Sequence, residues 1–148
     1  MTTPNFTTSF LVDATPDQVF DAVTNVRGWW SEEISGSTDK VGAVFEFHFQ
    51  DHHRSQHEIT ELVRGKKVVW KTLDASINFV ADKTEWNGTE VVFEIGKQGD
   101  QTELRFTHVG LVPQTECYGK CSNAWSFHIR SLRDLIATGK GQPNRAGE

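Results

Sequence analysis

Residues 124–137 read Ala-Trp-Ser-Phe-His-Ile-Arg-Ser-Leu-Arg-Asp-Leu-Ile-Ala, and Thr-Gly-Lys-Gly follows at 138–141. Apolar side chains recur in this stretch every three or four residues, at Trp125, Ile129, Leu132 and Ile136. That spacing predicts a long helix with one apolar face, which another part of the chain must cover. Gly139 can adopt the left-handed backbone conformation that ends a helix, so we expect the helix to stop there.

Upstream of this helix the apolar pattern changes to a period of two. Phe45, Phe47 and Phe49 alternate with Glu46 and His48, which predicts a strand with one aromatic and one polar face. Further strands are expected at 6–12, 57–63, 68–73, 90–95 and 102–109. The glycine-containing connections between the later strands are short, so these strands are predicted to be antiparallel neighbours.

Two short helices are expected after the first strand. Thr15 can cap a helix, Pro16 suits its first position, and Gln18 can complete a capping box. Trp29-Trp30 then predict a second short helix or turn, followed by a polar connection. Residues 76–86 leave open a further strand or a loop over the interior. The order is that of an α+β protein whose sheet covers its aromatic face with the last helix.

Five short motifs in register along the chain resemble those of one family. They are Thr15–Phe20, Trp29-Trp30, Trp86–Thr89, Thr107–Leu111, and Trp125 with Ser131-Leu132 and residues 138–141. In these motifs the chain resembles the activator of heat-shock-protein-90 ATPase-like branch of the START-like (SRPBCC) superfamily. The resemblance implies a helix-grip fold, in which a curved antiparallel sheet of about six strands wraps around the long C-terminal helix. It also implies a single domain over 1–148, with its core at about 6–139.

Composition narrows the classes of function. The chain of 148 residues is long enough for one domain with a sizeable core. Its net charge of −5 argues against nucleic acid and anionic membranes as partners. The absence of a long apolar run or a signal-like N-terminus predicts a cytoplasmic protein without membrane insertion. Cys117 and Cys121 are four residues apart, and we expect two reduced thiols.

Aromatic residues dominate the apolar inventory, with ten Phe and five Trp. Such rings either line a cavity or fill an aromatic-rich core. Leu104, Phe106 and His108 share one face of the last strand, and His128 lies on the packed side of the final helix. Two inward histidines can orient a ligand or act as an acid–base pair. Alternatively each is hydrogen-bonded within the core, as an isolated buried histidine usually is.

Metal binding and covalent catalysis find little support. His48, His52, His53 and His57 cluster near a predicted hairpin tip with Asp51, but adjacent histidines cannot easily aim at one point. We therefore expect solvated histidines and no metal site. No Gly-x-Ser-x-Gly elbow and no phosphate-binding glycine loop is found, so no catalytic residue and no cofactor is assigned.

The main hypothesis is a carrier or sensor of a small hydrophobic ligand, lipid-like or polyketide-like, in a cavity between sheet and final helix. The residues expected to contact the ligand are Trp30, Phe45, Phe47, Phe49, Trp70, Phe79, Phe93, Phe106, His108, Trp125 and His128.

The family resemblance adds two alternatives, a co-chaperone-type protein-interaction module and a polyketide cyclase/dehydratase-like enzyme that uses a cavity histidine. The co-chaperones that gave the family its name carry an additional N-terminal domain, whereas this sequence begins almost directly at the first strand. We therefore expect ligand binding rather than chaperone activation. The sequence does not predict the oligomeric state or the identity of the ligand.

Overall fold

The computed structural model describes residues 5–31, 34–49, 53–77, 86–112 and 118–142. The elements in chain order are β1 (Phe6–Val12), α1 (Pro16–Thr24), the 3-10 helix η1 (Val26–Gly28), β2 (Ile34–Gly36), β3 (Val44–Phe49), β4 (His53–Val63), β5 (Lys67–Ile77), β6 (Glu90–Gln98), β7 (Gln101–Val109) and α2 (Tyr118–Thr138). Of the two predicted alternatives, Trp29-Trp30 form a turn, which directly follows the 3-10 helix η1. The first helix ends at Thr24.

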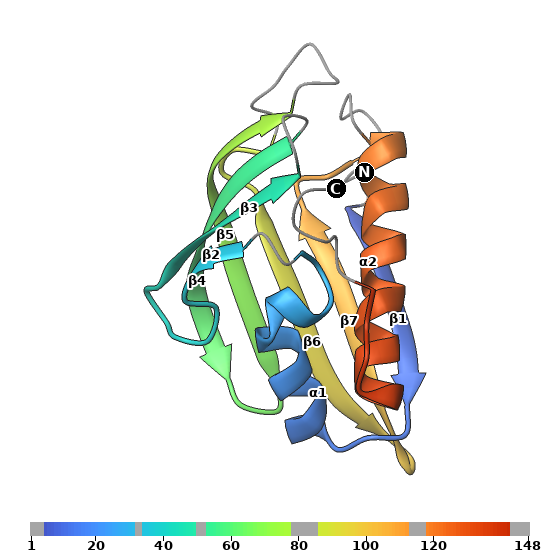
Figure 1. Ribbon diagram of the computed structural model, residues 1–148. Coiled ribbons are helices and arrows are strands. Elements are labelled where there is room, and N and C mark those ends of the chain that lie inside the picture. The colour runs from blue at the N-terminus through green and yellow to red at the C-terminus, as the bar shows by residue number, and fades with distance from the viewer. Residues whose placement is uncertain (1–4, 32–33, 50–52, 78–85, 113–117, 143–148) are drawn as a thin grey trace.

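All strands join one antiparallel sheet in the order β1-β7-β6-β5-β4-β3-β2. The sheet curves, and α2 lies across its hollow side close to β1 and β7 (Figure 1). The predicted helix-grip fold is therefore confirmed. Within the described residues the sheet has seven strands. The additional one is β2, a short edge strand in the polar stretch after Trp30. Its single buried apolar residue, Ile34, pairs with Phe47, and three residues are too few to display a period.

Strands β4 and β5 are longer than predicted and bend away from β6. Register shifts between Gln56 and His57 and between Ile59 and Glu61 bend this pair. The pairing of β5 with β6 ends at Lys71, so the rest of β5 continues beside β4 only. Beyond this point the backbone of β5 bonds to the turn before β6. The Ala75 N–H donates to Asn87 Oδ1 in that turn at 2.7 Å.

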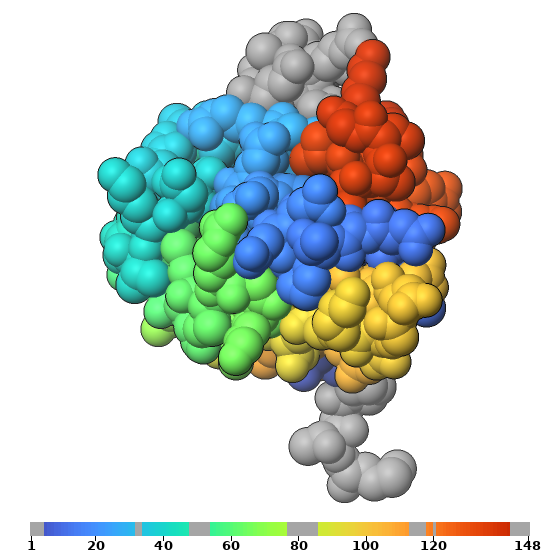
Figure 2. All heavy atoms as spheres, turned by 90° about the horizontal axis from the view of Figure 1, so that it is seen from below, coloured from blue at the N-terminus to red at the C-terminus, as the bar shows by residue number. Residues whose placement is uncertain are grey.

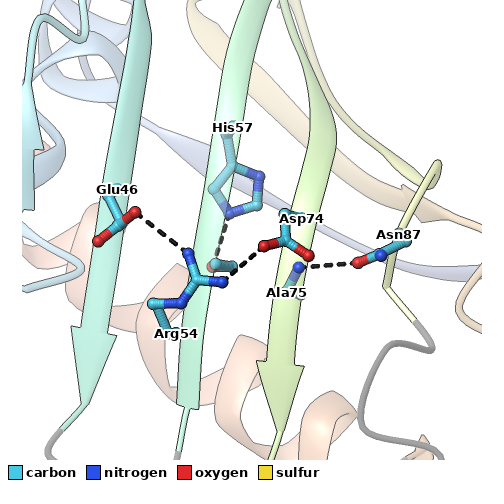
Figure 3. A network of polar contacts seen from close by, with 7 residues as sticks. Glu46, Arg54, His57, Asp74, Ala75 and Asn87 are labelled. Atoms are coloured by element: carbon cyan, nitrogen blue, oxygen red, sulfur yellow. Dashed lines mark hydrogen bonds and ion pairs between the residues drawn. The ribbon is translucent and has the colours of Figure 1, made fainter.

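The outer face of these strands carries a small charged network (Figure 3). Arg54 on β4 donates to Glu46 on β3 at 3.2 Å and to Asp74 on β5 at 2.6 Å. The hydrogen bond from Arg54 holds the pKa of Asp74 below its usual value. Because these side chains are partly exposed, the network helps to fix the register of three strands and adds little stability.

Helix α1 closes one end of the space between sheet and α2. Its predicted capping box is present, since the Gln18 N–H donates to Thr15 Oγ1 at 3.1 Å and the Thr15 N–H donates to Gln18 Oε1 at 2.9 Å. Val19 and Val23 are fully buried. Figure 2 shows α1 between the turn that joins β4 to β5 and the last turns of α2.

Helix α2 buries most of the stripe that the sequence predicted, and Ile136 at its end is partly buried. Trp125, Ile129 and Leu132 are at most 4% exposed. Gly139 has a φ of +84° and its N–H donates to Leu135 O, which ends the helix as expected. Just beyond the helix, the Gln142 N–H donates to Ser131 Oγ at 2.6 Å.

The expectation of two reduced thiols is wrong for Cys121, which is buried and disulfide-bonded. The only other cysteine of the chain, Cys117, lies outside the described residues. No helix in the described part of the chain is long and apolar enough to span a membrane.

Candidate functional site in the aromatic interior

The structure gathers most of the predicted ligand-contacting residues into one buried cluster between the sheet and α2. Each is at most 7% exposed, and ring contacts link them: Trp30, Phe45, Phe47, Trp70, Phe93, Phe106, His108, Trp125 and His128. The Phe49 side chain and Phe79 lie outside the described residues. Strand alternation explains the gathering, because Leu104, Phe106 and His108 face inward from β7 as expected.

Trp30 is the centre of this cluster. The turn η1 carries it inward, since the Trp30 N–H donates to Val26 O at 2.8 Å. Its ring lies 4.2 Å from that of Phe47 and 5.0 Å from that of Trp125, measured between centroids. It also contacts Trp70 at 5.8 Å and His128 at 6.2 Å. Trp30 therefore connects β3, β5 and α2 through one side chain.

The three indoles Trp29, Trp30 and Trp70 lie nearly parallel, with interplanar angles of 7–15°. Trp29 is tied to the first helix, because its Nε1–H donates to Val23 O at 3.2 Å. The Nε1–H of Trp70 is also buried, but no protein atom among the described residues accepts its hydrogen bond. Trp70 thus presents an unused donor inside an apolar cluster.

His108 has both ring nitrogens engaged, and its partners define its tautomer. The Trp125 indole can only donate, so His108 Nδ1 accepts its hydrogen bond at 3.0 Å. His108 Nε2 therefore carries the proton and donates to Thr89 Oγ1 at 2.9 Å. The Thr89 hydroxyl donates in turn to Trp86 O at 2.6 Å. This series of hydrogen bonds connects α2 to β7 and to the turn before β6.

His128 differs from His108 in its surroundings. It lies on α2 near Trp30 and Trp125, and its Nδ1 has no hydrogen-bond partner among the described residues. Burial lowers the pKa of His128 from 6.5 to about 4, so the ring is neutral near pH 7. Neutral imidazole offers one donor and one acceptor.

The sequence prediction missed His57, which was expected to be solvated. It is fully buried among the rings of Trp30, Phe45 and Trp70. Its Nε2 pairs with Ser55 Oγ at 2.8 Å (Figure 3) and its Nδ1 with Thr72 Oγ1 at 3.1 Å. The alternation along the strand could have predicted its burial, because His57 lies on the same face as the apolar Ile59.

Trp86 was also missed as part of the interior. It is 3% exposed, lies nearly parallel to Trp125 at 5.8 Å, and meets the edge of His108 at 4.7 Å. The sequence left residues 76–86 open between a strand and a loop, so no period marked the direction of the Trp86 side chain. Within the described residues, no group of three His, Cys, Asp or Glu is arranged to hold a metal ion.

The interior is uncharged in the part of the chain that the structure describes. Its buried polar side chains are only Ser, Thr and His, as no buried Asp, Glu, Lys or Arg is found there. The environment is therefore apolar, with a few fixed hydrogen-bonding groups, which is typical of a site for a small neutral molecule.

Comparison with known proteins agrees with this architecture. Residues 13–137 match the family described as Activator of Hsp90 ATPase homolog 1-like protein. The chain belongs to this family. The superfamily resemblance seen in the sequence is therefore confirmed, and comparison with the curated proteins gave no match.

Several solved structures are similar to this member of the family. The solution structure of the Aha1 dimer from Colwellia psychrerythraea has 27% identity and a TM-score of 0.76, covering 93% of this chain and 99% of that one. Two more share the fold. CalU16 from Micromonospora echinospora has 18% identity and a TM-score of 0.65, covering 92% of this chain and 75% of its own. Protein MLL2253 from Mesorhizobium loti has 17% identity and a TM-score of 0.68, covering 88% of this chain and 96% of that one.

The depressed pKa of His128 makes the stability of this family member depend on pH. The unfolded chain takes up a proton at His128 near pH 6.5, and the folded chain only near pH 4. The stability linked to neutral His128 is thus complete above about pH 6.5 and is lost as pH falls through about 4. We expect wild type to lose about 1.4 kcal/mol more per pH unit than His128→Phe across this window. Urea unfolding between about pH 7 and pH 4.5 measures this, and equal losses would contradict it.

Proposed function

We propose that this chain binds a small hydrophobic ligand, lipid-like or polyketide-like, in the interior between the sheet and α2. One observation carries the proposal: Trp70 Nε1 and His128 Nδ1 are buried and lack partners among the described residues. A buried polar group without a hydrogen bond costs about 1–3 kcal/mol, so folded proteins leave few of them. A bound molecule with a polar group would supply the missing bonds, and the surrounding rings would cover its apolar part.

The two rings that carry the unpaired nitrogens both contact Trp30. The centroid of Trp30 lies 5.8 Å from that of Trp70 and 6.2 Å from that of His128. A ligand placed against Trp30 would thus lie close to the rings of Trp70 and His128. The roles of the two predicted histidines then separate, since His108 holds α2 to the sheet and His128 meets the ligand.

Titration with 2-acetylnaphthalene, a small aromatic ketone, tests the proposal. We expect saturable quenching of tryptophan fluorescence, because five Trp are present and those of the interior surround the site. Phe47→Leu should raise the dissociation constant about threefold to tenfold, since Phe47 stacks on Trp30 at 4.2 Å. The control is Leu11→Ala on β1, where Leu11 is 46% exposed. Folded wild-type protein that shows no saturable change would refute the proposal.

A second candidate comes from the family description, which names an activator of the Hsp90 ATPase. We expect no such activation here, because the features that suggest recognition lie in the interior, beyond the reach of a partner protein. The test adds the purified protein to the heat-shock-protein-90 homologue of its host and measures ATP turnover. A several-fold, saturable stimulation would favour the interaction-module interpretation instead.

The geometry gives less support to a cyclase- or dehydratase-like enzyme. An efficient general acid or base has a pKa near the working pH, whereas burial lowers the pKa of His128 to about 4. Both nitrogens of His108 are occupied by Trp125 and Thr89. Ligand binding is compatible with the low pKa of His128 and with the hydrogen bonds of His108. Acid–base catalysis would require a higher pKa at His128 or a free nitrogen on His108.

A further inference from the structure

We infer that the ligand is uncharged and presents a carbonyl or hydroxyl oxygen to the Nε1–H of Trp70. This inference rests on the proposed function and adds the chemical class of the molecule that the interior selects.

The requirement for an oxygen follows from the chemistry of Trp70. An indole N–H only donates, so an acceptor must meet it. Trp70 is fully buried, and the rings of Phe45 and Phe93 pack against it at 4.9 and 5.0 Å. Neither of these rings offers an acceptor of the strength of an oxygen. A purely apolar ligand would leave the donor unpaired, and a carbonyl or hydroxyl oxygen would satisfy it.

His128 adds a second polar contact that suits the same class. Its neutral ring presents Nδ1 without a partner among the described residues, and this nitrogen donates or accepts according to the tautomer. A ligand hydroxyl can donate as well as accept, and a carbonyl can only accept. Either group is therefore compatible with His128, and neither requires a charge.

The rest of the interior disfavours a charged ligand. The described residues include no buried Lys or Arg that could pair with a carboxylate or phosphate. His57 already pairs with Ser55 and Thr72, and His108 with Trp125 and Thr89. A buried anion without a cation is strongly disfavoured, so we expect the site to reject ionised fatty acids and to accept ketones, phenols and alcohols.

Three probes of nearly equal size test this selection in the wild-type protein. They are 2-acetylnaphthalene, 2-ethylnaphthalene and 2-naphthoate, which is ionised at neutral pH. We expect the ketone to bind several-fold more tightly than the hydrocarbon and at least about tenfold more tightly than the carboxylate. Tryptophan quenching and calorimetry give the dissociation constants.

Trp70→Phe isolates the indole N–H because an aromatic ring remains. We expect it to weaken binding of the ketone about tenfold and to change binding of the hydrocarbon by less than about twofold. Trp29→Phe is the matched control. Trp29 lies nearly parallel to Trp70, but its Nε1–H already donates to Val23 O. It should change the affinity of both probes by the same factor. His128→Phe provides a second variant if Trp70→Phe fails to fold, and it should reduce the preference for the ketone over the hydrocarbon.

The outcomes separate the two proposals. If none of the probes binds to folded wild type, the proposed function itself fails. If the probes bind but the carboxylate binds as tightly as the ketone, only the inference of an uncharged ligand is overturned. Equal effects of Trp70→Phe on ketone and hydrocarbon would likewise overturn the role of the indole N–H.

Discussion

Leu132→Asp is expected to unfold the protein or to abolish its cooperative thermal transition. Leu132 is fully buried in the contact between α2 and the sheet. An unpaired carboxylate at this place costs several kcal/mol, which is comparable with the whole stability of a domain, about 5–15 kcal/mol. Circular dichroism during heating measures the effect, and a near-wild-type transition would show that α2 does not pack on the sheet.

The control for Leu132→Asp is the next residue. Arg133 is exposed on the same helix, so Arg133→Asp places a carboxylate in the same turn but leaves it in water. We expect a change in the free energy of unfolding within about 0.5 kcal/mol. The contrast between the two variants separates burial of the charge from its effect on the helix.

Trp30→Ala is expected to lower the free energy of unfolding by about 3–5 kcal/mol. The indole of Trp30 contacts rings on β3, β5 and α2, so its removal leaves a void that rigid neighbours cannot close. Urea unfolding followed by far-ultraviolet circular dichroism measures the loss. The same variant should also lose the binding of the naphthalene probes.

A truncation on the surface provides the comparison for Trp30→Ala. Phe127 is 50% exposed on α2, and Phe127→Ala should change the free energy of unfolding far less than the interior substitution. Losses of similar size in the two variants would mean that Trp30 does not join the sheet to the helix as described.

Only part of the candidate site was predictable from the sequence. Strand alternation and helical spacing placed Phe106, His108 and Trp125 correctly on inward faces, because the direction of a side chain within an element follows from its position along the chain. The same rule applies to His57, which is the first residue of the strand predicted at 57–63 and shares a face with Ile59. Because His57 lies close to a predicted hairpin tip, it was instead grouped with the solvated histidines.

The sequence by itself determined the long helix and its end at Gly139, the capping box at Thr15 and the alternating faces of β7, all through contacts between near neighbours in the chain. Only the tertiary structure decided what the histidines do. His108 is satisfied by Trp125 and Thr89, which are 17 and 19 residues away, whereas His128 meets no such partner among the described residues. Hydrogen bonds of this kind depend on which elements the folded sheet and helix bring together, and no local pattern records that choice.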